Sequence, residues 1–221
     1  MNYALVNRRS CIPLNRTVLR NRRILLLIYL LIAMSCLAFA GDDGSGTLAA
    51  RSSRSSKSSP SIFIIDKGAR APRQLVDFIC SNNGYLDSAF AEKLVRTYIK
   101  ESRREGVNYD VAICQMCLET GFLRFNGTVS RFQNNFCGLG ATDAYTAGDW
   151  FGSMEEGVRA HIQHLKAYAS IEPITPPYAD KRLVHVRRGT VYTIHDLTGR
   201  WAADPLYGEK ISRLLSQLYL R

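Results

Sequence analysis

Residues 108–142 read NYDVAICQMCLETGFLRFNGTVSRFQNNFCGLGAT, and this stretch decides the fold. Its first half predicts a helix buried on most sides, because nearly every residue from Val111 to Leu118 is apolar. Asn108 or Asp110 can cap the start, since a short polar side chain accepts hydrogen bonds from the free amides of a first turn. Gly121 predicts a left-handed C-terminal end.

Glu119 stands at the very end of this predicted helix. Apolar surroundings and the partial negative charge of a helix C-terminus both disfavour an ionised carboxylate, so we expect the pKa of Glu119 to be raised. A raised pKa lets a carboxylic acid hold its proton near neutral pH, as a general acid must. The alternative is a glutamate that projects into water or pairs with Arg124.

The second half of the stretch combines amides and glycines. Residues 133–135 are Gln-Asn-Asn, and residues 136–140 are Phe-Cys-Gly-Leu-Gly. Adjacent amides present donors and acceptors together, and glycines allow close backbone approach, which suits a neutral ligand rich in hydroxyl and acetamido groups. A turn held by local Asx-type hydrogen bonds explains the same residues equally well.

Four ordered blocks extend the pattern: LETGF (118–122), QNNFCGLGAT (133–142), WFGSMEEGVRAHIQHLKAYAS (150–170) and GRWAADPLYGEKI (199–211). From about Pro72 to Leu220 the chain thereby closely resembles the glucosaminidase family of bacterial autolysins, glycoside hydrolase family seventy-three. The resemblance implies a mainly α, lysozyme-like helical domain with a small irregular or β lobe. It also implies cleavage of the glycan strand of peptidoglycan.

The resemblance places the family's catalytic acid on Glu119. Tyr207 would contact the reacting sugar and position or polarise an acetamido group. The chain departs from the family at Phe122, where tryptophan is common, and in its short second lobe. The family's two other blocks fall on Asn134, Asn135 and Gly138, which would shape a substrate-binding cleft, and on Asp204 and Pro205 beside Tyr207.

A second catalytic carboxyl group is usual in glycosidases. Asp143, Asp149, Glu155 and Glu156 all follow Glu119 in the chain. Glu155 and Glu156 open a predicted helix, where the helix dipole favours acids for structural reasons. Asp143 and Asp149 are therefore the predicted second catalytic residues. Assistance by the substrate's own acetamido group would require neither.

Aromatic side chains are the predicted contacts to sugar faces, because they combine a flat apolar area with polar edges. Packing in the core is the alternative for each ring. The predicted substrate-binding rings are Phe122, Tyr145, Trp150 and Trp201.

The apolar pattern predicts further helices around the central one. It also predicts a short strand at 61–65 and one small hairpin in the glycine-rich residues 122–152. The expected helices cover 73–81, 87–104, 153–169, 190–197 and 207–220.

The N-terminal third predicts export. Residues 1–40 hold six arginines before an apolar run, residues 24–40, that ends Ala-Phe-Ala, as in a signal peptide cleaved after Ala40. An uncleaved membrane tether through residues 24–40 is the alternative, whereas lipidation at Cys36 fits poorly. Residues 41–61 form a Ser-rich flexible linker, and residues 62–221 form the catalytic domain. We expect a periplasmic or envelope location, with or without an inner-membrane anchor.

The charge, cysteine and histidine patterns argue against nucleic-acid binding, redox chemistry and metal binding. The formal net charge of +10 falls to +4 without residues 1–40, which contain no acid, so no nucleic-acid partner is indicated. Cys114 and Cys117 lie inside a predicted helix, and the chain has no second CxxC. This pattern favours small buried side chains over a zinc or redox site. The sequence does not decide the disulfide pairing. His161 and His164 lack an evident third ligand. We expect no metal and no cofactor.

The sequence thus predicts an exported endo-β-N-acetylglucosaminidase that acts on peptidoglycan glycan strands, with Glu119 as general acid. Two alternatives remain: a lytic transglycosylase or muramidase acting on the same strand, and a catalytically silent wall-binding or assembly module. The sequence indicates no oligomeric state.

Overall fold

A computed structural model describes residues 59–141 and 146–220 of the chain. This part is mainly helical, which confirms the predicted fold class. None of its helices combines the length and the apolar character needed to cross a bilayer. The predicted leader and most of the predicted linker lie outside the described residues. The α-helices are α2 (Pro72–Asn82), α3 (Ser88–Glu105), α4 (Tyr109–Thr120), α5 (Met154–Ala169) and α6 (Tyr207–Tyr219); the 3-10 helices are η2 (Arg131–Gln133), η3 (Leu183–His185) and η4 (Ile194–Leu197).

Helix α4 begins and ends where its sequence predicts. The Asn108 side chain accepts hydrogen bonds from the backbone N–H groups of Asp110 and Val111, at 3.0 and 3.4 Å. Gly121 follows the last turn with a φ of 57°, the left-handed conformation that glycine adopts without a steric cost. These two caps fix the position of Glu119 one residue before the helix ends.

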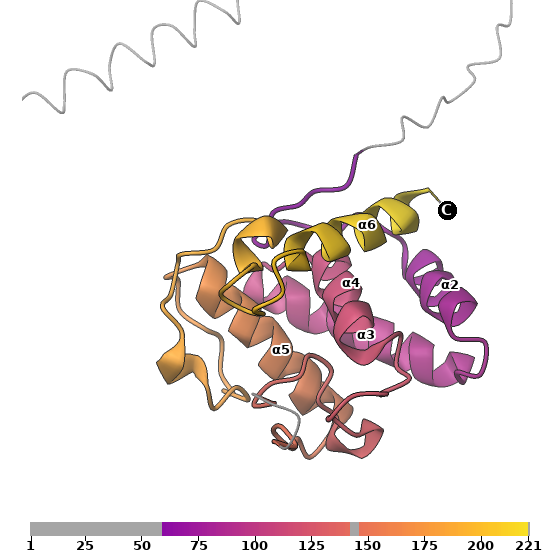
Figure 1. Ribbon diagram of the computed structural model, residues 1–221, viewed down its shortest axis with the longest axis horizontal. Helices are drawn as coiled ribbons and strands as arrows, with labels where there is room; N and C mark the ends of the chain where they lie inside the picture. The colour runs from indigo at the N-terminus through magenta and orange to yellow at the C-terminus, as the bar shows by residue number, and fades with distance from the viewer. Residues whose placement is uncertain (1–58, 142–145, 221) are drawn as a thin grey trace, which may run out of the picture. The chain divides into compact units, whose positions relative to one another are not determined.

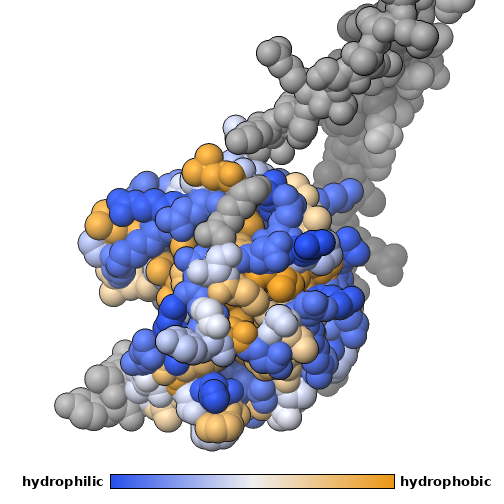
Figure 2. All heavy atoms as spheres, turned by 90° about the vertical axis from the view of Figure 1, so that its right-hand side faces the viewer, coloured by the Kyte–Doolittle hydropathy of each residue, from blue (hydrophilic) through white to orange (hydrophobic). Residues whose placement is uncertain are grey.

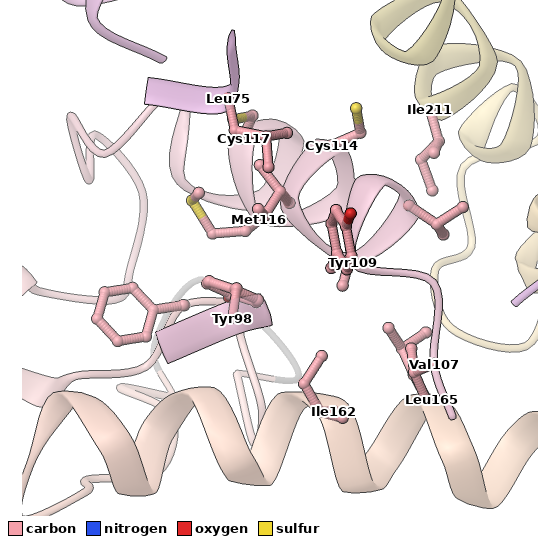
Figure 3. Packing of buried hydrophobic residues seen from close by; sticks show 14 of the residues in the cluster. Leu75, Tyr98, Val107, Tyr109, Cys114, Met116, Cys117, Ile162, Leu165 and Ile211 are labelled. Carbon is pink, nitrogen blue, oxygen red and sulfur yellow. The ribbon is translucent and has the colours of Figure 1, made fainter. Parts of the chain in front are cut away.

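Helix α4 occupies the centre of the helical body, with α2, α3, α5 and α6 around it (Figure 1). Figure 3 shows Ile162 and Leu165 pointing from α5, and Ile211 from α6, toward side chains of α4 such as Met116. All four are fully buried. Burying a side chain of this size stabilises the fold by about 1.5–3 kcal/mol. Because these contacts come from different helices, α4 is held from several sides.

The cysteines of the described residues are all free thiols, and Cys114 and Cys117 are buried in this core as small apolar side chains. This arrangement confirms the prediction for the CxxC pair. The outer surface is different in kind: the face shown in Figure 2 carries mostly hydrophilic residues with scattered hydrophobic ones.

The segment between α4 and α5 forms the predicted irregular lobe. The predicted hairpin is wrong for its described residues, which contain only the 3-10 turn η2. Side-chain amides hold this lobe instead of a strand ladder: Asn135 exchanges hydrogen bonds with the backbone N–H and C=O of Leu139, and Asn134 donates to the carbonyl oxygen of Phe151. These side-chain hydrogen bonds therefore hold the lobe without a β-hairpin.

Two other local predictions are corrected. Of residues 190–197, only Ile194–Leu197 are helical, because the preceding residues are extended and pair with the N-terminal segment. The backbone N–H of Ile64 donates to the carbonyl oxygen of Tyr192 at 2.9 Å. The predicted strand at 61–65 is limited to isolated bridges to Thr193 and Val107.

Helix α5 and the lobe meet at Gly157. A Cβ atom at this position would lie 1.7 Å from the carbonyl oxygen of Asn134. We expect Gly157→Ala to lower the Tm by about 3–10 °C, since the backbone must shift to relieve the overlap. Thermal unfolding followed by circular dichroism measures the change. Gly127→Ala is the matched control, because a Cβ there meets no atom within 4 Å; equal Tm values for the two variants would contradict the prediction.

Candidate active site

Glu119 lies in a groove between the helical body and the lobe. On one side is a cavity of about 410 Å³ whose lining includes Trp201 and Arg182. On the other is a cavity of about 250 Å³ whose lining includes Val129. Glu119 and Gly138 line both cavities, so the carboxyl group stands where the two meet.

The two oxygens of Glu119 have different surroundings. Oε1 accepts a hydrogen bond from Nε1–H of Trp201 at 3.1 Å and a second one from the hydroxyl of Tyr207. Oε2 faces Gly138, where a Cβ would lie 3.6 Å away. Pairing with Arg124, the alternative considered for Glu119, does not occur, because Arg124 donates instead to the carbonyl oxygens of Gly121 and Asn82.

The pKa of Glu119 is raised above its ordinary value, as the sequence predicts. The side chain is open to the groove, but protein surrounds its other sides, and this loss of hydration disfavours the charged form. The hydrogen bonds from Tyr207 and Trp201 act in the opposite direction, because they stabilise the carboxylate. Desolvation is the largest contribution, so the pKa is raised overall and Glu119 keeps its proton to a higher pH than a free glutamate.

A chain of buried polar groups runs behind this carboxyl. The hydroxyl of Tyr98 lies 2.9 Å from Nδ1 of His161, and Nε2 of His161 lies 3.0 Å from Oε1 of Gln115. Nε2 of Gln115 donates to the hydroxyl oxygen of Tyr207 at 2.9 Å. Tyr98, His161 and Gln115 have no exposed surface, and Tyr207 is 4% exposed. The chain therefore connects the core to Oε1 of Glu119.

The direction of every hydrogen bond in the chain follows from Gln115. Its amide N–H donates to Tyr207, so its oxygen accepts from His161, which must carry its proton on Nε2. Burial, and secondarily the charge of His164, lowers the pKa of His161 to about 3, so the ring is neutral and Nδ1 accepts from Tyr98. Each donor thus points toward Glu119, and the Tyr207 proton is directed at Oε1.

Asp149 and Arg182 form an ion pair beside the groove. Nε of Arg182 lies 2.8 Å from Oδ2 of Asp149, and Nη2 lies 3.3 Å from Oδ1. A Cβ at Gly140 would overlap both side chains, so this glycine makes room for the pair. Asp143, the other predicted carboxyl, lies outside the described residues.

The predicted substrate-binding residues occupy different environments. Trp201 lines the larger cavity and packs against His164, with ring centroids 5.1 Å apart. Phe122 packs edge-on against Phe78 at 5.6 Å, in the core. Trp150 is 63% exposed and lines neither cavity that contains Glu119. Tyr145 lies outside the described residues.

The lobe amides have partners within the protein. Asn135 has no exposed surface, and its side-chain N–H also donates to the carbonyl oxygen of Asp149 at 3.1 Å. It borders the smaller cavity. Asn135 thus forms part of the groove wall, whereas Asn134 lines neither cavity that contains Glu119.

Three residues of the site were not predicted from the sequence: Gln115, Arg182 and Tyr168. Gln115 lies within an apolar run, and a polar residue in such a run is a usable sign of a buried partner. Arg182 and Tyr168 carry no comparable local signal. In the described part of the chain, no three His, Cys, Asp or Glu side chains are grouped to hold a metal ion.

Comparisons with known proteins identify the family of this chain. A family model described as glucosaminidase, mannosyl-glycoprotein endo-beta-N-acetylglucosaminidase, matches residues 95–220. An uncharacterized protein of Borreliella burgdorferi is 47% identical over 156 residues, which cover 71% of this chain and 76% of that protein. The residues matched by the family model include all of α4 and the groove residue Trp201.

Proposed function

Because the chain belongs to the glucosaminidase family, we propose that it is an endo-β-N-acetylglucosaminidase that cleaves the glycan strand of peptidoglycan. The family supports peptidoglycan hydrolysis in general. The observation that carries the finer proposal is the position of Glu119, a carboxyl group with a raised pKa at the meeting point of two cavities. An open groove on both sides of an acid suits a polymer that extends past the bond to be cleaved.

Glu119 would act as general acid through Oε2. Oε1 already accepts two hydrogen bonds, so the acid's own proton belongs on the other oxygen. Oε2 would deliver that proton to the glycosidic oxygen as the bond to the sugar breaks. Negative charge then develops on the carboxyl group, where Tyr207 and Trp201 donate. Donors fixed in advance at a site of developing charge stabilise the transition state.

Asp149 is the proposed second catalytic carboxyl among the described residues, as the sequence predicts. Both Glu119 and Asp149 are close enough to Cys137 to contribute to its raised pKa, after the larger effect of burial. Arg182 holds the Asp149 carboxylate in a two-point contact at the groove. From there it would act as base toward an attacking water. Asp143 stays a prediction, and so does assistance by the substrate's acetamido group.

A catalytic base at Asp149 predicts unequal losses at the two members of the ion pair. We expect Asp149→Asn to lower kcat for release of soluble fragments from sacculi at least about tenfold, because an amide cannot accept a proton from an attacking water. Arg182→Gln should lose less, since the Asp149 carboxylate is still present. Equal losses in the two variants would show that the carboxylate serves only the ion pair.

Among the predicted sugar contacts, Trp201 is the ring that faces the groove beside the acid. We propose that it contacts the reacting sugar, while Asn135 shapes the groove wall and Asn134 acts by holding the lobe. Phe122, Trp150 and Tyr145 stay predictions for more distant contacts. Tyr207 is nearly buried, so its proposed role is exerted on Glu119.

The products of digestion test the proposed reaction. Purified sacculi are digested with the full-length chain, and the fragments are identified by mass spectrometry after borohydride reduction. Reduced N-acetylglucosamine ends are expected. Reduced muramic acid ends would indicate a muramidase, and anhydro-muramic ends a lytic transglycosylase. Absence of any soluble fragment, with retained binding, would indicate a wall-binding or assembly module.

A family of cell-wall hydrolases indicates an extracellular or envelope location. We propose that residues 1–40 direct export as a signal peptide, or through residues 24–40 as an inner-membrane tether. Residues 41–61 would then form a linker to the catalytic domain, residues 62–221. Peptidoglycan is the proposed partner.

A further inference from the structure

A second pocket shares Tyr168 with the larger cavity. This second pocket encloses about 420 Å³. The rest of its lining consists of His185, Arg187, Thr190 and Arg200, with no acidic side chain. A space lined by two arginines thus adjoins the cavity that contains Glu119.

Backbone hydrogen bonds fix this pocket to the end of α5. The backbone N–H of Thr190 donates to the carbonyl oxygen of Tyr168 at 2.9 Å, and the Thr190 hydroxyl donates to the carbonyl oxygen of Arg187 at 2.9 Å. The Tyr168 hydroxyl donates to the carbonyl oxygen of Arg200 at 3.0 Å. Both arginines are thus carried on segments tied to one tyrosine at the edge of the groove.

The segment of chain that carries the two arginines has an excess of positive charge. Residues 59–221 contain twenty lysines and arginines and seventeen acids, a formal net charge of +3. Residues 181–200 alone contain five of these cations and one acid, a formal net charge of +4. Two of the five, Arg187 and Arg200, line the pocket. A local excess of one sign attracts ligands of the other sign to that end of the groove.

We propose that this pocket binds the carboxylates of the peptide stems that the glycan strand carries. The inference rests on the proposed function, because it takes the strand in the groove to be peptidoglycan. Stem peptides branch from the sugars of that strand and bear free carboxylates, so a strand bound beside Glu119 brings them within reach of Arg187 and Arg200. The guanidinium group matches a carboxylate through paired N–H donors. The pocket would thus select wall that bears stem peptides with free carboxylates over bare glycan.

Two sacculus preparations test the charge requirement directly. Both are acetylated on their free amines, and in one the stem carboxylates are then converted to carboxamides. The substrates differ in charge but hardly in size. The full-length chain is compared with Arg187→Gln/Arg200→Gln, by kcat/KM for release of soluble fragments and by co-sedimentation with the sacculi, which requires no cleavage.

We expect the double variant to lose about fivefold or more in kcat/KM and in binding on the carboxylate substrate, and less than about twofold on the carboxamide substrate. The matched control is Arg73→Gln/Arg96→Gln, two arginines that line another surface hollow together with Asp77 and Glu92. This control should not discriminate between the substrates.

Equal losses on both substrates, or no loss, would overturn the proposal. So would a loss of binding that disappears when anionic wall polymers are extracted from the sacculi, because the pocket would then bind those polymers. A wild-type chain that cleaves neither substrate would refute the proposed hydrolase function, while co-sedimentation would still decide what the pocket binds.

Discussion

Glu119→Gln is expected to lower kcat for peptidoglycan cleavage about 10³-fold. Glutamine retains an oxygen that can accept from Tyr207 and Trp201, so the site geometry is preserved, but it has no proton to deliver to a glycosidic oxygen. Substrate binding should change little. Zymography and the rate of fragment release from sacculi measure the loss, and co-sedimentation measures binding.

The control is Glu92→Gln, which removes an exposed carboxylate on α3 that pairs with Arg96. It should cleave at the wild-type rate. If Glu119→Gln cleaves within about tenfold of the wild-type rate, Glu119 is not the general acid.

The second large effect is expected for Tyr207→Phe, which should lower kcat about 10²-fold. The substitution keeps the ring but removes one of the two donors to Oε1. The carboxylate that forms as the proton leaves is then less well stabilised. The same loss shifts the pH profile in a definite direction. Tyr207 lowers the pKa of Glu119 by hydrogen bonding, so without it the pKa rises further and Glu119 stays protonated to a higher pH.

The alkaline limb of the pH–rate profile should therefore move to higher pH in Tyr207→Phe even as the maximum rate falls. A general structural disturbance would lower the rate without this shift. An alkaline limb that stays in place or moves to lower pH would contradict the assignment.

The buried chain behind Tyr207 predicts effects that diminish with distance from the acid. We expect Gln115→Leu to lower kcat about tenfold, because Tyr207 loses the donor that orients its hydroxyl. Tyr98→Phe, at the end of the hydrogen-bonded chain away from Glu119, should lower kcat by a smaller factor. An equal loss at both positions would indicate a packing effect and not an oriented chain.

Helix α4 and its caps could be predicted because their causes are local. An apolar run, an asparagine before it and a glycine after it decide where the helix begins and ends, and hence where Glu119 stands. The apolar surroundings that partly desolvate this carboxyl follow from the same residues. For this reason the direction of its pKa shift was accessible from sequence.

The partners of Glu119 could not be predicted from such patterns. Tyr207 and Trp201 lie more than 80 residues away in the chain, and the sequence predicted both as sugar contacts, not as hydrogen-bond donors to Glu119. The Gln115–Tyr207 hydrogen bond spans 92 residues. The hairpin prediction failed because side-chain amides such as Asn135 satisfy the lobe's backbone, which glycine spacing does not reveal.

The free thiols of the core have a consequence for redox chemistry. Burial raises the pKa of Cys114, Cys117 and Cys137, so almost none of the reactive thiolate forms at neutral pH. Oxidants and alkylating reagents therefore have little to attack while these helices stay packed. In the described part of the chain, packing therefore shields these three thiols whatever the redox state of the surroundings.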